Sequence, residues 1–190
     1  MRGSACFGEV LVMPGGHLDE SLPFKKLSIA VLTVSDTRDE ESDSSGALLA
    51  ERIIAAGHAV AARAIVKDDR GAIQRQVSAW IDDPAIHAVI STGGTGLTGR
   101  DVTPEAFREL FDKEMEGFQV VWHLVSYESV GVSTLQSRAC AGIARGTVIF
   151  ALPGSNGACR DAWDKIIRNQ LDARHRPCSL VELMPRLNER

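Results

Sequence analysis

A glycine-rich stretch over residues Ile86–Ala106 constrains the fold of this 190-residue chain more than any other part of the sequence. Apolar residues predict a buried strand over Ile86–Ile90, and Thr103 followed by Pro104 predicts a helix start with Thr103 as its N-cap. The glycines between strand and helix are Gly93, Gly94, Gly96 and Gly99. Such a turn gathers backbone N–H groups at the positive end of a helix dipole, so it suits a phosphate group.

The glycine-rich turn has a second interpretation, as a plain connection between a strand and a helix. Its spacing is neither the dinucleotide pattern GxGxxG nor a Walker loop, because no GK[ST] follows. Asp101 comes directly after the loop, with Arg100 beside it. A carboxylate among phosphate-binding amides repels the ligand unless a cation such as Mg²⁺ bridges the two. The alternative role for Asp101 is that of a turn residue bonded to its own backbone.

Strands and helices alternate along the rest of the chain. Apolar runs predict further strands over Leu27–Val34, Val60–Val66 and Gly146–Leu152. Helical spacing of apolar residues predicts helices over Ser45–Ala56, around Ile73, Val77 and Trp80, over Gly117–Val130, and over Asn156–Asn169. Gly131–Gly142 reads as an irregular stretch. Continuous apolar strands in this order predict a three-layer α/β fold, a mostly parallel sheet with helices on both faces.

We expect three segments along the chain. Residues 1–26 form an N-terminal arm, either disordered or an expression remnant, since the chain starts MRGS. Residues 27–178 form the domain, and residues 179–190 form a C-terminal tail, within a region from Leu171 that carries two prolines and mixed charge. The acidic run Asp39–Asp43 reads as a solvated loop, whose position after the first strand would also suit a lid. Trp80 and Trp163 lie on apolar helical faces and are expected in the core.

The composition excludes several kinds of partner. A formal net charge of −4 argues against nucleic acid, whose binders show a basic face. The sequence holds no apolar run near the roughly 18 residues that a membrane span needs, so we expect no membrane partner. The four cysteines (Cys6, Cys140, Cys159 and Cys178) include no CxxC pair, which favours buried or idle thiols in a reducing, cytoplasmic setting. The five histidines show no metal-binding spacing.

Polar residues follow the predicted strands at four places, and the carboxyl ends of parallel strands are where open α/β sheets bind ligands. These places are Ser35–Asp36, Asp68–Asp69, Thr92–Asp101 and Pro153–Asn156. Asp68 and Asp101 each follow a strand, so both carboxylates can face one ion. Mg²⁺ takes one or two protein carboxylates and completes its shell with water and phosphate oxygens. The alternative role for Asp68 is that of a helix N-cap.

The run TGGTGLTGRDVTPEA resembles the signature of the MoaB/Mog family of molybdenum cofactor biosynthesis proteins, which gephyrin-type domains share. The resemblance extends from about Leu27 to about Cys178 and is greatest to MoaB. It implies the molybdopterin-binding-domain fold and a homotrimer or a dimer of trimers. It also implies a Mg²⁺-dependent molybdopterin adenylyltransferase. This activity joins AMP from ATP to the terminal phosphate of molybdopterin and releases pyrophosphate.

The resemblance also implies residue roles. Asp68 and Asp101 match the acidic pair that binds Mg²⁺ in active members, whereas some MoaB proteins that lack the first acid are thought inactive. The substrate- or nucleotide-binding residues would be Asp36, Thr92, Gly93, Gly94, Thr95, Gly96, Ser137, Arg138, Pro153, Gly154 and Ser155. Of these, the amides of Gly93–Gly96 would hold phosphate, and Ser137 and Arg138 would face the pterin phosphate. The sequence PGSN at positions 153–156 departs from the PGNP of many active relatives.

Two alternatives to the transferase follow. The first is a non-catalytic molybdopterin-binding or scaffold paralogue in the same pathway, suggested by the MoaB-like body and the altered PGSN loop. The second is an unrelated nucleotide-binding α/β enzyme such as a dehydrogenase. The absence of GxGxxG after the first strand argues against this second alternative.

Overall fold

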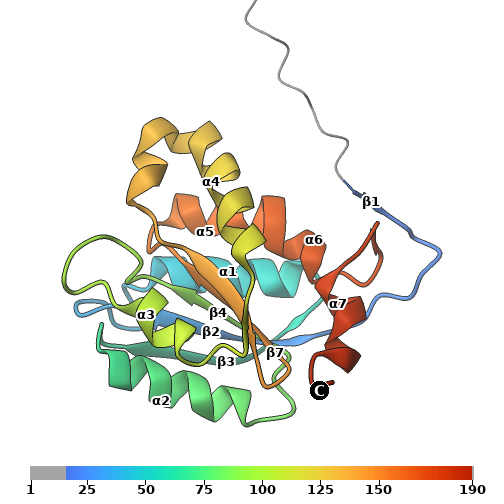
Figure 1. The fold of residues 1–190 in the computed structure, drawn as a ribbon, viewed down its shortest axis with the longest axis horizontal. Helices are drawn as coiled ribbons and strands as arrows, with labels where there is room; N and C mark the ends of the chain where they lie inside the picture. The colour runs from blue at the N-terminus through green and yellow to red at the C-terminus, as the bar shows by residue number, and fades with distance from the viewer. Residues whose placement is uncertain (1–15, 190) are drawn as a thin grey trace, which may run out of the picture.

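A six-stranded sheet organises the protein, whose computed structural model describes residues 16–189 (Figure 1). The strands, in their order across the sheet, are β3 (Ala59–Val66), β2 (Ser28–Val34), β4 (Ala88–Thr92), β7 (Thr147–Leu152), β6 (Cys140–Ala144) and β5 (Lys113–Glu114). The first four pair in parallel, while β6 pairs antiparallel with both β7 and β5. The prediction of a mostly parallel sheet is confirmed.

Helices cover both faces of this sheet (Figure 1). One face carries α1 (Ser44–Ala55), α4 (Glu116–Val130), the 3₁₀ turn η1 (Gly131–Gln136), and a long helix formed by α5 (Asn156–Ala162), the π turn η2 (Trp163–Ile167) and α6 (Arg168–Gln170). The opposite face carries α2 (Arg70–Ile81) and α3 (Thr103–Arg108). The three-layer prediction is therefore confirmed.

The alternation of side chains along β2 explains why both faces need a cover. Ile29 and Val31 pack under α1, whereas Ala30 and Leu32 pack over α2, and all four are buried. Burial of a valine, leucine or isoleucine side chain stabilises the fold by about 1.5–3 kcal/mol relative to exposure. Trp163 lies in the first core and Trp80 in the second, as the sequence predicts.

The sequence did not predict the antiparallel strands β6 and β5. β6 lies in the segment predicted to be irregular, because its five residues CAGIA are small and carry only one large apolar side chain. β6 leads into β7 through a tight turn at Arg145 and Gly146, both with positive φ. The prediction for the third strand also ends too early, because β4 continues through Ser91 and Thr92, two buried polar residues that interrupt the apolar pattern.

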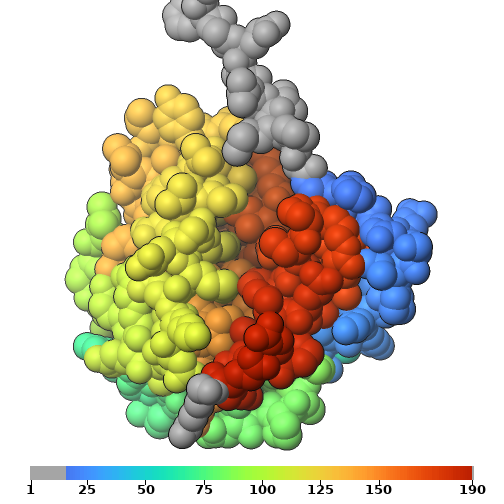
Figure 2. All heavy atoms as spheres, turned by 45° about the vertical axis from the view of Figure 1, so that its right-hand side comes forward, coloured from blue at the N-terminus to red at the C-terminus, as the bar shows by residue number. Residues whose placement is uncertain are grey.

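The prediction of a C-terminal tail from Leu171 is wrong. Leu171 and Val181 are buried in the main core, and β8 (His175–Arg176) pairs with β1 (His17–Leu18). The segment continues into α7 (Leu180–Leu183) and η3 (Met184–Arg186). Figure 2 shows the red C-terminal segment against the body of the molecule, next to the blue N-terminal segment. Of the predicted arm, residues 1–15 lie outside the described residues.

The described helices include none with the length and apolarity required to cross a bilayer. The thiols of Cys140 and Cys159 are buried, as predicted, and burial raises the pKa of Cys140 to about 12 and that of Cys159 to about 11. Cys178 is an exposed thiol, and Cys6 lies outside the described residues. The two buried thiols are therefore protonated at neutral pH and chemically inert.

Asp43 corrects the prediction of a solvated acidic loop, because its carboxylate is buried while residues 39–42 are exposed. Its Oδ1 accepts a hydrogen bond of 2.9 Å from the Gly46 amide, which caps α1. Its Oδ2 accepts from the Thr33 hydroxyl at 2.9 Å and from the Arg63 guanidinium at 3.1 Å. Asp43 therefore links α1 to two neighbouring strands.

We predict that Asp43→Ala lowers the free energy of unfolding by about 3 kcal/mol, because it removes the helix cap and leaves Arg63 without its buried partner. Urea denaturation measures this loss. The matched control is Asp39→Ala, whose carboxylate bonds only to Ser42 in the exposed loop. We expect it to change stability by less than about 0.5 kcal/mol. Equal losses in the two variants would contradict the structural role of Asp43.

A buried histidine, His58, makes stability depend on pH. Its Nδ1 accepts a 3.1 Å hydrogen bond from the Leu27 amide, so this nitrogen must be unprotonated in the fold. Burial lowers the pKa of His58, and the charge of Asp172 opposes this only in part. The unfolded chain therefore binds a proton at a higher pH than the folded chain does. Stability that is present above the unfolded pKa of about 6.5 is lost as the pH falls toward the lower folded value.

We predict that His58→Gln reduces the loss of stability that the wild-type protein shows between about pH 7.5 and about pH 5.5. The change removes the titrating group, whose contribution cannot exceed about 1.4 kcal/mol per pH unit. Urea denaturation at both pH values measures it. His17→Gln, at an exposed position, serves as control and should keep the wild-type pH dependence. The same pH dependence in wild type and His58→Gln would show that other groups cause it.

Candidate active site

The glycine-rich loop between β4 and α3 depends on two glycines that no other residue can replace without strain. Gly93 has φ +105° and Gly94 has φ +66°, a region that L side chains rarely adopt. A Cβ on Gly93 would lie 2.1 Å from the Val34 carbonyl oxygen. A Cβ on Gly94 would lie 2.3 Å from Thr103 Oγ1. The loop is therefore in close contact with the end of β2 and the start of α3.

Thr103 does not cap α3 as predicted. Val102 occupies the N-cap position and makes no side-chain cap, while Thr103 is the first helical residue. The Thr103 hydroxyl donates instead to the Gly93 carbonyl at 3.0 Å, and its amide donates to the Gly94 carbonyl at 3.0 Å. Thr103 thereby fastens the glycine-rich loop to the helix that follows it.

Some backbone amides of the loop donate hydrogen bonds to the protein, and others do not. The Gly93 amide donates to the Leu152 carbonyl at 2.9 Å, so it cannot hold phosphate as predicted. The Gly96 amide points to the Asp101 carboxylate. Over residues 16–189, the amides of Gly94 and Thr95 donate to no protein acceptor. These two amides remain available for an anionic ligand.

Arg138 stabilises the loop through hydrogen bonds to its backbone carbonyls. Its Nε donates to the Gly96 carbonyl at 2.6 Å, its Nη2 donates to the Asp101 carbonyl at 2.6 Å, and its Nη1 pairs with Glu105. The Arg138 amide also donates to the Thr95 carbonyl at 2.9 Å. The guanidinium is thus occupied by the protein, and Arg138 does not line the cavity beside the loop, although the resemblance implies that it faces the pterin phosphate.

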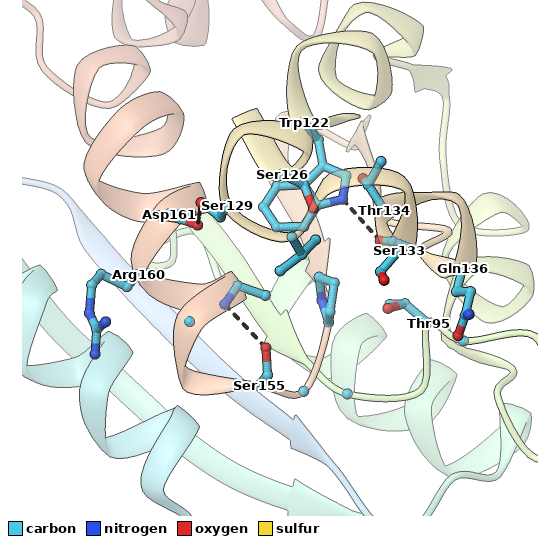
Figure 3. A pocket seen from close by; sticks show the side chains of 18 of the residues that line it. Thr95, Trp122, Ser126, Ser129, Ser133, Thr134, Gln136, Ser155, Arg160 and Asp161 are labelled. Atoms are coloured by element: carbon cyan, nitrogen blue, oxygen red, sulfur yellow. Dashed lines mark hydrogen bonds between the residues drawn. The ribbon is translucent and has the colours of Figure 1, made fainter. Parts of the chain in front are cut away.

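A cavity of about 760 Å³ lies beside the loop (Figure 3). The sequence-predicted residues that line it are Gly93, Gly94, Thr95, Gly96, Asp101, Ser137, Pro153, Gly154 and Ser155. Thr92 does not line it, because this buried side chain donates to the Pro153 carbonyl at 3.1 Å, behind the wall. Asp36 and Asp68 also lie outside the lining. The cavity lining therefore includes parts of two of the four predicted strand-end segments, 92–101 and 153–156.

The sequence analysis missed the opposite wall, which comes from α4, η1 and α5. Its polar and aromatic members are Trp122, Ser126, Ser129, Ser133, Thr134, Gln136, Arg160 and Asp161. The prediction for α4 considered only its apolar face. Ser126 and Ser129 lie three residues apart on α4, which places two small polar side chains on one helical face, and Ser133 follows in η1. This spacing is the signal that could have revealed the wall.

Asp68 and Asp101 border the same loop. A Cβ on Gly94 would lie 2.9 Å from both carboxylate oxygens of Asp68, and a Cβ on Gly96 would lie 2.8 Å from Asp101 Oδ2. Asp68 Oδ1 accepts a 3.2 Å hydrogen bond from the Val102 amide, directly after Asp101. Two acids that are 33 positions apart in the sequence (101 − 68) are thus brought to one turn.

The alternative roles of the two acids are resolved separately. Asp69, not Asp68, caps α2, because its Oδ1 accepts from the Ala72 amide at 2.7 Å. Asp101 does behave as a turn residue through one oxygen, since its Oδ2 accepts from the Thr98 amide at 2.9 Å and from the Thr98 hydroxyl at 2.6 Å. The Gly96 amide is a further donor to this carboxylate.

The carboxylates of the site repel one another, and a bound cation would relieve this repulsion. Burial raises the pKa of Asp68, and the nearby charges of Asp101 and Asp36 raise it further. The pKa of Asp101 is lowered, because hydrogen bonds from Thr98 and Gly96 outweigh the effect of burial. The pKa of Asp36 is also lowered, by its bond to Arg100 at 2.6 Å. Asp36 is thus paired with Arg100 rather than free to bind a ligand.

The loop Pro153–Ser155 completes the site. The Arg38 guanidinium donates to the Gly154 carbonyl at 3.0 Å. A Cβ on Gly154 would lie 3.3 Å from the Gly93 Cα, so the two loops are in close contact. Ser155 is the N-cap of α5, and its Oγ accepts from the Ala158 amide at 3.2 Å. The Ser155 hydroxyl proton remains free to be donated to a ligand in the cavity.

Comparison with known proteins gives one consistent result. Residues 30–173 match the family described as "Probable molybdopterin binding domain". The chain is 55% identical over 159 residues to molybdenum cofactor biosynthesis protein B of Escherichia coli K12, covering 84% of this chain and 94% of the relative. It is 46% identical over 142 residues to the protein of that name from Bacillus subtilis, covering 74% and 84%.

Solved structures agree with the sequence comparison. A crystal structure of molybdenum cofactor biosynthesis protein B superimposes with a TM-score of 0.78 at 40% identity, over 87% of this chain and 98% of the other. The tungsten cofactor synthesizing protein MoaB from Pyrococcus furiosus superimposes with a TM-score of 0.68 at 34% identity, over 87% and 99%.

Proposed function

Since the chain belongs to the molybdopterin-binding-domain family of molybdenum cofactor biosynthesis proteins, we propose that it is a Mg²⁺-dependent molybdopterin adenylyltransferase. It joins AMP from ATP to the terminal phosphate of molybdopterin and releases pyrophosphate. One observation carries the proposal: Asp68 and Asp101 border a loop whose Gly94 and Thr95 amides are unused, at the edge of a cavity of about 760 Å³. A cavity of this size suits a small-molecule substrate.

The donor set at the loop fits Mg²⁺. The two carboxylates supply oxygen ligands, and their mutual repulsion, which contributes to the raised pKa of Asp68, is relieved by a divalent cation. Residues 16–189 contain no cluster of three or more His, Cys, Asp or Glu side chains suited to a metal. Asp68 and Asp101 would therefore hold Mg²⁺ together with water and phosphate oxygens. Bound there, Mg²⁺ neutralises the charge of the two anionic substrates and of the departing pyrophosphate.

The reaction is an in-line displacement at the α-phosphorus of ATP. A terminal phosphate oxygen of molybdopterin forms the new bond to this phosphorus, while the bond from the phosphorus to the bridging oxygen breaks and pyrophosphate leaves. The nucleophile is already an anion, so the protein need not remove a proton. The Gly94 and Thr95 amides orient the phosphate groups, and Arg138 keeps those amides in place through the Thr95 and Gly96 carbonyls.

Incubation of the purified protein with molybdopterin, ATP and Mg²⁺ tests this proposal. We expect adenylylated molybdopterin and pyrophosphate, and no product when EDTA replaces Mg²⁺. A wild-type protein that binds molybdopterin and makes no product would overturn it.

A non-catalytic molybdopterin-binding protein of the same pathway is the second candidate. One observation favours it: Asp68 lies behind Gly94 and does not line the cavity. In this case the protein binds ATP without adenylyl transfer, and Asp68→Ala leaves binding of ATP and molybdopterin unchanged. Isothermal titration calorimetry of wild type and variant separates the two candidates.

We also propose that the chain assembles as a homotrimer or a dimer of trimers in the cytoplasm. Large apolar side chains that are exposed on α4 and η1 support an assembly; they include Val120, Leu124, Val132 and Leu135. Light scattering should give three or six times the chain mass of 20.5 kDa. A mass of one chain would contradict the proposal.

A further inference from the structure

The wall that α4 and α5 contribute to the cavity carries a carboxylate that the adenylyl transfer does not use. Asp161 on α5 lines the cavity, and its Oδ2 accepts a 2.6 Å hydrogen bond from the hydroxyl of Ser129 on α4. Figure 3 shows these two side chains meeting where the helices approach each other. The Asp161 side chain is only 22% exposed. Its orientation is therefore held by a neighbour in a largely covered place.

The remaining hydrogen-bonding capacity of Asp161 is available to a ligand. A carboxylate can accept about four hydrogen bonds, and Ser129 supplies one. Lys165 lies 3.9 Å from Asp161 Oδ1, which is too long for a hydrogen bond, and it binds Glu128 at 3.1 Å instead. Arg160 is next in sequence, but Figure 3 shows its side chain directed away from the Ser129–Asp161 pair.

The two ends of the cavity have opposite chemistry. The Gly94 and Thr95 amides at one end donate hydrogen bonds and suit phosphate. The carboxylate at the other end repels phosphate and accepts hydrogen bonds from N–H groups. Trp122 lines the cavity between them, with its Nε1 donating to Ser137 at 2.9 Å (Figure 3). The Trp122 side chain is only 2% exposed, so it forms part of the cavity wall and is held in the core.

We propose that Asp161 recognises the pterin ring of the substrate through the ring's 2-amino group and N3–H. These are two parallel donors, which a carboxylate accepts together. Adenine presents an amino donor beside the acceptor N1, whose lone pair a carboxylate repels, so Asp161 selects pterin over adenine. The pterin thus occupies the α4–α5 end, with its phosphate toward the glycine-rich loop. This inference rests on the proposed function for the identity of the ligand.

Binding of two simple heterocycles tests the assignment without any turnover. The probes are 6-hydroxymethylpterin and 6-hydroxymethyllumazine, which differ in that an oxygen replaces the 2-amino group. We expect the wild-type protein to bind the pterin at least about tenfold more tightly than the lumazine, because the carboxylate keeps the N3–H donor but faces a carbonyl oxygen in place of the 2-amino donor. Fluorescence titration measures both affinities. We expect Asp161→Asn to lose this preference and to bind ATP as the wild type does.

The matched control is Asp164→Asn, which removes the same charge three residues along the helix. Asp164 pairs with Arg52 at 3.0 Å and does not line the cavity, so this variant should keep the preference for pterin. Three results overturn the assignment: equal affinity of the wild type for both heterocycles, a preference that survives in Asp161→Asn, or weaker ATP binding in that variant. If the preference depends on Asp161 and no adenylyl transfer occurs, the assignment holds and only the proposed transferase fails.

Discussion

Asp101→Asn is expected to reduce adenylyl transfer by at least about 10³-fold, because an amide of the same shape no longer supplies the charge that holds Mg²⁺. This factor corresponds to about 4 kcal/mol of transition-state stabilisation. The amide oxygen can still accept the hydrogen bonds from Thr98, so the loop should keep its conformation. Measurement of kcat/KM, together with a thermal melt, separates lost chemistry from lost folding.

Asp68→Asn is expected to reduce adenylyl transfer by a similar factor. It should not lower the stability of the metal-free protein. Burial and the charges of Asp101 and Asp36 already raise the pKa of Asp68, so its ionised form destabilises the fold in the absence of a cation. Removal of the charge should therefore leave the unfolding temperature of the metal-free protein unchanged or raised. The stabilisation that added Mg²⁺ confers on the wild type should disappear in the variant.

Asp69→Asn is the matched control for both substitutions. Asp69 is adjacent to Asp68 but caps α2, and asparagine caps a helix about as well as aspartate does. We expect wild-type kcat/KM and stability. If Asp69→Asn and Asp68→Asn lose the same activity, the effect comes from the general negative charge of this region. Full activity in Asp101→Asn would remove the acid pair from the mechanism.

Gly93→Ala is expected to lower the free energy of unfolding by about 3–4 kcal/mol, as the sum of a strained backbone and a collision. Its φ of +105° is unfavourable for alanine, and the new Cβ would lie 2.1 Å from the carbonyl oxygen of Val34. That oxygen belongs to the backbone at the end of β2 and cannot move alone. The Gly93 amide also binds Leu152, so a shift of this residue disturbs both neighbouring strands.

Gly99→Ala is the matched control in the same loop. A Cβ there meets no atom within 4 Å, and Gly99 is not among the residues with positive φ. We expect a change of less than about 0.5 kcal/mol. Urea denaturation of both variants at one pH gives the comparison. Wild-type stability in Gly93→Ala would mean that the close approach between the loop and β2 is not required.

Much of the fold follows from patterns that local physics produces. The run of β-branched and apolar residues at Leu27–Val34 can only be a strand buried on both faces, and Ile73, Val77 and Trp80 can only share one face of a helix. β6 could not be found in this way, because small residues such as Ala141 and Gly142 fit between β7 and β5 but have no strong intrinsic preference for a strand.

The site likewise contains parts that local sequence patterns predict and parts that they do not. The glycine-rich loop and Asp101 are visible in the sequence because they form one continuous segment, whose backbone conformation only glycine tolerates. The opposite wall is only hinted at by the serine spacing on α4, because Trp122, Ser129 and Asp161 become neighbours only when α4 packs on α5. No local rule states which of several serines on a helix will face a cavity.

The sequence by itself determined the layered α/β architecture, the family and the position of the glycine-rich loop, because each depends on residues close together in the chain. Only the tertiary structure decided how each candidate residue is used. It committed Arg138 and the Gly93 amide to holding the protein together, and it left the Gly94 and Thr95 amides open. It also placed Asp161 in the cavity wall, beside Ser129. The physical reason is that a polar group serves a ligand only when no other part of the folded chain has already taken its hydrogen bonds.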